Sequence, residues 1–291
     1  MLSNDHMVFR RLKIGFGMAR RSGNVLLDHP KLLVFPLVGG LSGIAFLATL
    51  FGGLFFVGSV FEDPGVVVYG ALLAAYLVET FVASFFSAGL IAATRTTLEG
   101  KEPSVRDGLR KAWEHKEALL VWSVIAAVVG VVIRMIESQD NFVARILAGL
   151  FAVAWGVMTY FVVPVIVFRD PSVREMFEES ARTFKNTWGE SIGAMGAINV
   201  VTLLLALVGV AVGAAVLFLV PTATTGGLIL TAVVGGSAVI FGVLVGKTLT
   251  GIAKTALYVY ATENAAPKYF EDMDFGRLGG ENESGGIGGR L

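Results

Sequence analysis

The sequence contains no cysteine and little charge. Without cysteine there is no disulfide, no thiolate nucleophile and no cysteine-ligated zinc or iron–sulfur site. Charged residues make up 16% of the chain, against about 25% in soluble domains. The 23 basic and 23 acidic side chains cancel, so we expect no general attraction to nucleic acid.

Catalytic patterns are also missing. The only histidines are His6, His29 and His115, which are far apart in the sequence. No H-E-x-x-H, G-x-S-x-G, phosphate-binding loop or dinucleotide fingerprint occurs. We therefore expect no enzyme, no metal site and no cofactor.

Long apolar runs fill most of the chain, and apolar residues make up 55% of it. About 20 consecutive apolar residues cross a bilayer as a helix. We predict an all-α, polytopic membrane bundle in which residues 1–262 form one six-span domain. The predicted spans cover about 32–61, 65–93, 118–136, 142–168, 192–220 and 227–259.

Lysines and arginines gather before the first span, between the second and third, and between the fourth and fifth. Basic residues are retained on the cytoplasmic side of a membrane. We therefore predict a protein of the plasma membrane with both termini in the cytoplasm. The glycine-rich tail, 263–291, is expected to be mostly disordered, because it has too little apolar area to bury.

A short motif occurs twice, as Pro103–Asp107 and as Pro171–Glu175. Each places serine at a helix N-cap and an acid three residues later, the capping-box pattern. We predict that amphipathic helices at 7–27, 104–116 and 172–188 each precede a helical hairpin, giving three repeats of one unit. The alternative is that capped amphipathic helices before spans are a general feature of membrane proteins.

Two charged residues fall near the middle of predicted spans, Glu79 in the second and Lys247 in the sixth. An ionised group at the bilayer centre costs at least ~2.5 kcal/mol and usually faces the bundle interior. We predict that Glu79 and Lys247 face each other at matching depth. Further polar residues share their helical faces: Tyr76, Ser87, Lys254 and Tyr258.

These residues have two interpretations. They form a polar path or binding site, or they form a structural ion pair while Lys254 extends to the interface. The ion pair is favoured, because one Glu and one Lys are few for a transport pathway. Asn199 and Thr202 in the fifth span are expected to make helix–helix contacts, and Pro36 and Pro164 to kink their spans.

Four stretches together resemble an uncharacterised family of prokaryotic six-span membrane proteins, across roughly residues 8–262. They are Asp28–Pro36, Pro103–Leu109, Phe161–Val165 and Thr187–Glu190. The layout is also similar to the membrane domain of some glycerophosphodiester phosphodiesterases, although the sequence contains no counterpart of their soluble catalytic domain. The resemblance implies no reaction.

Two functions are expected. The first is a non-enzymatic membrane protein whose surface helices organise lipid or dock a partner at the cytoplasmic leaflet, where each basic residue contributes about 1 kcal/mol. The alternative is a transporter or channel for an ion or small molecule, with a polar path through Glu79 and Lys247. Membrane lipids are the expected partners, and a protein partner or a second copy is left open.

Overall fold

The computed structural model describes residues 2–57, 65–138, 141–219, 225–263 and 265–273. The described residues form helices and turns without any strand, and six helical segments are long and apolar enough to cross a membrane. The predicted fold class is therefore confirmed. Most of the predicted disordered tail, 274–291, lies outside the described residues.

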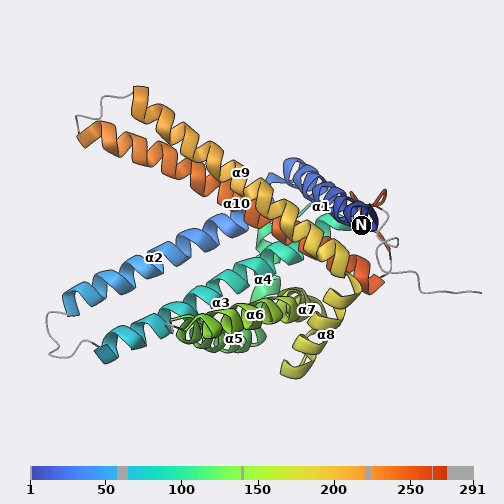
Figure 1. Ribbon diagram of the computed structural model, residues 1–291, viewed down its shortest axis with the longest axis horizontal. Helices are drawn as coiled ribbons and strands as arrows, with labels where there is room; N and C mark the ends of the chain where they lie inside the picture. Colours follow the sequence, from blue (N-terminus) through green and yellow to red (C-terminus); the bar gives the residue numbers. More distant parts are fainter. Residues whose placement is uncertain (1, 58–64, 139–140, 220–224, 264, 274–291) are drawn as a thin grey trace, which may run out of the picture.

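The spans come in three pairs, and an amphipathic helix precedes each pair (Figure 1). The amphipathic helices are α1 (Leu2–Asp28), α4 (Val105–Glu114) and α8 (Val173–Asn186). The paired spans are α2 (Val34–Val57) with α3 (Gly65–Leu98), α5 (Lys116–Glu137) with α6 (Phe142–Thr159) and α7 (Val162–Arg169), and α9 (Trp188–Leu219) with α10 (Thr225–Glu263).

The junction between amphipathic helix and span is alike in the first two repeats. His29 separates α1 from a short 3-10 helix (Pro30–Leu33) that leads into α2, and His115 separates α4 from α5. The Nδ1 atom of His29 lies 3.7 Å from a Glu102 carboxylate oxygen, and that of His115 lies 3.6 Å from one of Asp170. Each acid belongs to the connection that leads to the next repeat.

The amphipathic helices also join the repeats to one another. Helix α4 packs against α3, and α8 packs against α6 and α7, so each contacts the span pair that precedes it in the chain. Helix α1 packs against α9 and α10. The first repeat thus contacts the third, and the contacts between repeats close into a ring.

Local signals in the sequence set where these helices begin. At α4 the backbone N–H of Asp107 donates to Ser104 Oγ over 3.2 Å. At α8 the backbone N–H and hydroxyl of Ser172 donate to Glu175 Oε2, over 2.9 and 2.7 Å. These bonds lower the pKa of Glu175, because they stabilise its ionised form.

The fourth span is broken between α6 and α7. Pro164 lies in the first turn of α7, where its missing N–H is not needed, while its ring would clash with the carbonyl of Tyr160 in a continuous helix. The break exposes backbone donors, and the N–H of Phe161 donates to Ser180 Oγ on α8 over 2.9 Å. An amphipathic helix therefore satisfies a backbone group that the proline break leaves free.

The two ends of the bundle are packed differently. We call the end that carries α1, α4 and α8 the basic end, and the opposite end the distal end. In Figure 1 the α2/α3 pair and the α9/α10 pair diverge toward the distal end. The largest fully buried side chains, such as Phe35, Ile91, Ile166 and Tyr258, lie toward the basic end.

Glycines bring spans close together where the sequence contains G-x-x-x-G pairs. A Cβ atom on Gly213 would lie 3.0 Å from the Cα of Gly235, and one on Gly242 would lie 3.0 Å from the carbonyl carbon of Leu205. The α9/α10 pair therefore stays together while it diverges from α2. In the first pair, Gly39 faces the ring of Phe86 on α3.

The last described residues pack back onto the first repeat. Residues 265–273 form turns rather than helix, and Phe270 is fully buried. The Tyr269 hydroxyl lies 3.3 Å from His29 Nε2, and Arg21 donates to the Tyr269 carbonyl over 2.9 Å. The chain beyond α10 thus helps to hold α1 against the bundle.

Candidate functional site

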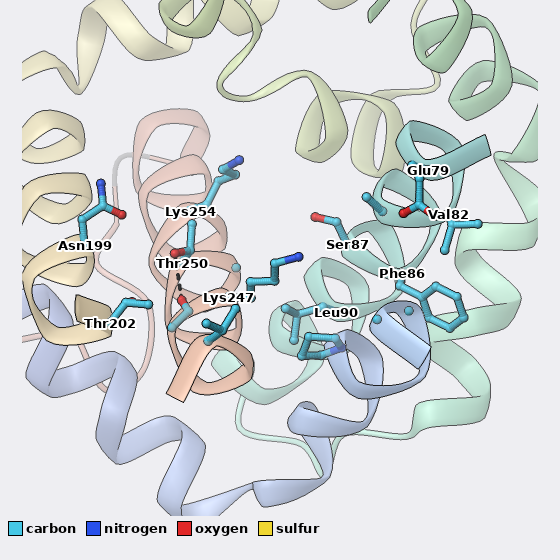
Figure 2. Close-up of a pocket in the computed structure, with 17 residues that line it drawn as sticks. Glu79, Val82, Phe86, Ser87, Leu90, Asn199, Thr202, Lys247, Thr250 and Lys254 are labelled. Atoms are coloured by element: carbon cyan, nitrogen blue, oxygen red, sulfur yellow. Dashed lines mark hydrogen bonds between the residues drawn. The ribbon is translucent and has the colours of Figure 1, made fainter. Parts of the chain in front are cut away.

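A cavity of about 390 Å³ lies between the first and third span pairs. Its charged lining residues are Glu79 on α3 and Lys247 and Lys254 on α10. Lys247 extends from α10 toward α3 (Figure 2). The rest of the lining combines apolar side chains, such as Phe86 and Leu90, with polar or small residues: Gly39, Gly40, Ser87, Asn199, Thr202, Gly246, Thr250 and Gly251.

Glu79 and Lys247 line the same cavity but lie at different levels along the bundle. Leu90 of α3 lies directly against Gly251 of α10, and Figure 2 shows Lys247 extending toward Ser87. Glu79 precedes Ser87 by eight residues, about 12 Å at 1.5 Å per residue. The structure brings the two residues into one cavity without joining them as an ion pair.

The carboxylate of Glu79 is held against α2. A Cβ atom added to Gly43 would lie 2.7 Å from Glu79 Oε2, so only glycine at position 43 leaves room for this arrangement. Within the described part of the chain, Glu79 Oε1 is buried without a hydrogen-bond partner. A buried, unsatisfied acceptor is costly, so a hydrogen bond from a ligand or water that reached this oxygen would be favourable.

Lys254 lies in the interior of the bundle instead of extending to the interface. Its ammonium group is 4.5 Å from the centroid of the Tyr160 ring, a cation–π distance. Tyr160 lies at the break between α6 and α7. The proline break therefore places an aromatic ring beside a cationic group.

A second cavity, of about 620 Å³, shares a wall with the first. Tyr76 lines only the second cavity, while Glu79, Ser87 and Lys254 line both. Nearby on α5, the indole N–H of Trp122 donates to Ser84 Oγ over 3.1 Å. Polar surface therefore continues along α3 from one cavity to the other.

Tyr258 lines neither cavity. Its ring is buried at the basic end and stacks on Phe168, with centroids 5.5 Å apart and an interplanar angle of 27°. Between the cavity and the basic end of the bundle, Arg95 of α3 forms ion pairs with Glu263 of α10 at 2.6 Å and with Glu99 at 2.8 Å. The hydrogen bond from Arg95 lowers the pKa of Glu99, and these contacts join α3 to α10 below the cavity.

Several lining residues carry no functional signal in the sequence. Asn199 and Thr202 were expected as helix-packing groups, and Thr202 does lie against Gly246, yet both also line the cavity. Thr250 and Tyr160 were not singled out at all. The one available signal for Thr250 is its spacing, three residues after Lys247 and four before Lys254, which places it on the same helical face.

Within the described residues, no group of three metal-ligating side chains lies together. A family model described as a family of unknown function (DUF6159) matches residues 66–267, and the chain belongs to that family. The resemblance to an uncharacterised six-span family is thereby confirmed. No curated protein and no solved structure matches the chain.

Proposed function

We propose that this member of a family of unknown function is a transporter-type membrane protein, which binds a polar or charged group in the cavity between its first and third span pairs. The observation behind the proposal is the gathering of Glu79, Lys247 and Lys254 around one cavity without an ion pair between the acid and either lysine. Charges that served only to hold helices together would neutralise each other directly, because a buried carboxylate without a partner is costly.

In this proposal the protein acts without catalysis. The basic end faces the cytoplasm and the bundle lies in the plasma membrane, in agreement with the distribution of lysine and arginine. The cavity alternately takes up and releases its ligand, while the contacts of Arg95 with Glu99 and Glu263 limit access from the basic end.

Organisation of lipid or docking of a partner by the amphipathic helices is the second candidate. Trp113 on α4 is 61% exposed, as an interfacial anchor would be. Several charges of α4 and α8, however, pair within their own helix, as in Arg110 with Asp107 at 3.1 Å and Arg174 with Glu178 at 2.6 Å. Less cationic charge is then left for anionic headgroups, which is why the cavity ranks first.

The test uses the absence of native cysteine. Ser87→Cys and Thr250→Cys, both in the cavity lining, are treated with a membrane-impermeant thiol reagent in sealed vesicles. We expect both to react at least tenfold faster than Leu203→Cys. Leu203 is a matched control, because it is next to cavity-lining Thr202 on α9 but is 59% exposed on the outside of the bundle.

Equal protection at all three positions, in protein that remains folded, would overturn the proposal, because the cavity would then be closed to water. Reaction at Ser87→Cys and Thr250→Cys from one side of the vesicle only would show from which side the cavity opens.

A further inference from the structure

We infer that the ligand is an anionic phospholipid, whose headgroup contacts Lys247 and Lys254 and whose acyl chains lie between α2 and α10. This inference deepens the proposed function and rests on it. It draws on the charge of the cavity, its depth in the bundle and the surfaces that continue from it.

The charge of the cavity favours an anion. Two lysines and one glutamate line it, and Lys247 is exposed within the bundle. Glu79 lies about 12 Å farther toward the distal end, by its eight-residue offset from Ser87. A headgroup near Lys247 and Lys254 would therefore lie closer to these two ammonium groups than to the carboxylate of Glu79. Phosphate oxygens are strong hydrogen-bond acceptors for lysine.

The depth of Lys247 suits a headgroup. Helix α10 has 39 residues, a length of about 58 Å at 1.5 Å per residue, whereas the hydrocarbon layer is about 30 Å thick. Lys247 lies 22 residues after Thr225, about 33 Å from the distal start of α10. It therefore reaches the level at which the hydrocarbon ends and headgroups begin on the side of the basic end.

Apolar walls continue from the cavity toward the distal end. On α10, Ile240 and Val233 precede Lys247 at seven-residue steps and share its face, with 52% and 60% of their surfaces exposed. On α2, Ile44 follows the lining residue Gly40 by one turn and is 60% exposed. Helices α2 and α10 diverge toward the distal end in Figure 1, and these exposed side chains would contact the acyl chains.

The size of the first cavity is consistent with a headgroup inside it and acyl chains outside it. Its volume of about 390 Å³ is near the low end of the roughly 300–1,000 Å³ of small-molecule sites. It has room for a headgroup, while the chains of a phospholipid stay outside it. A polar solute taken from water would gain nothing from contact with the apolar side chains that continue toward the distal end.

The experiment measures lipid binding by the delipidated full-length protein in detergent. The probe is short-chain phosphatidylglycerol, and bound lipid is detected as a saturable rise in the unfolding midpoint. We expect Lys247→Met and Lys254→Met each to weaken binding about fivefold, the equivalent of about 1 kcal/mol per lysine near an anionic lipid. Lys247→Arg should retain binding.

Two control variants separate headgroup recognition from folding. Lys116→Met removes a lysine at the basic end, where its ammonium lies 5.3 Å from the Trp113 ring and outside both cavities, and binding should not change. Ile240→Trp narrows the apolar gap without changing a charge. It should weaken binding of phosphatidylglycerol while Ser87→Cys, combined with it, still reacts with the thiol reagent.

Phosphatidylcholine of equal chain length and inorganic phosphate serve as comparison ligands, and both should bind at least tenfold more weakly than phosphatidylglycerol. If inorganic phosphate binds as tightly, the site takes a free anion and the lipid inference is overturned while the proposed function stands. The same holds if neither lysine variant changes lipid binding although Ser87→Cys reacts. Protection of Ser87→Cys in the delipidated protein would overturn both.

Discussion

The basic and distal ends of the bundle are built from similar apolar sequence yet are held together in different ways. Helix α2 shows the contrast within a single element, because Phe35 near its start is 1% exposed and Phe55 near its end is 82% exposed. At the basic end, Phe35 packs against Gly89 of α3 and Gly108 of α4, where an added Cβ atom would lie within 3.0 Å of its ring. Helix α4 therefore supplies a packing partner for α2 at the basic end.

The two ends also differ in which repeats contact one another. At the basic end, side chains of different repeats bury one another and form ion pairs, as Arg95 does with Glu263. At the distal end the spans keep close contact mainly within a pair, as at Gly213 and Gly235. The repeats are thus held in a ring at one end, while the first and third pairs diverge at the other (Figure 1).

The largest expected effect comes from removing the buried ring of Phe35 at the basic end. Phe35→Ala should destabilise the protein by about 3–5 kcal/mol, the usual cost of removing a buried aromatic side chain. Unfolding in mixed micelles with increasing dodecyl sulfate measures it. Phe55→Ala, on the same helix, should change stability by less than about 0.5 kcal/mol. Similar losses for the two variants would mean that the ends do not differ in packing.

An intermediate effect is expected where the third pair is held together. Gly242→Val should cost about 1–3 kcal/mol, because the new side chain is forced into the backbone of α9. The matched control is Gly236→Val on the same helix, since a Cβ atom there has nothing within 4 Å. In the same unfolding assay, equal costs for the two substitutions would contradict close packing of α9 on α10.

The smallest effect is a pH dependence at the basic end. The pKa of Glu99 is lowered from its ordinary value of 4.5, chiefly by the hydrogen bond from Arg95. A lowered folded-state pKa gives stabilisation that is present above pH 4.5 and is lost as the pH falls through the folded pKa. Glu99→Gln should therefore be less stable than the parent protein at pH 7, and the difference should be smaller at pH 3.

Unfolding midpoints of the two proteins at both pH values check this prediction. A difference that persists undiminished at pH 3 would show that charge on Glu99 does not contribute, and that its side chain acts through packing alone.

Local features of the sequence predicted much of the fold. The six spans follow from run lengths that a bilayer requires, and the starts of α4 and α8 follow from capping patterns within four residues. The break near Pro164 likewise has a local cause, the missing N–H and the clash of its ring. Each depends on neighbours in the chain, so no knowledge of the tertiary fold is needed.

The candidate site could be predicted only in part. Glu79 and Lys247 stand out because charge is rare in a span, and both line the cavity. Matching their depths by counting from the middle of each span did not work, because Leu90 of α3 lies against Gly251 of α10, and Glu79 is eleven residues before this contact while Lys247 is four residues before it. The level of Lys247 is instead that of Ser87.

By itself, the sequence determined that this protein is an all-α membrane bundle with capped amphipathic helices and charged residues inside two spans. These properties depend on composition, periodicity and nearest neighbours along the chain. Only the tertiary structure decided that Lys254 lies over Tyr160, that Asn199 and Thr202 line a cavity, and that the span pairs diverge. Those contacts join different repeats, and the relative shift and tilt of packed helices depend on side chains that are far apart in the sequence.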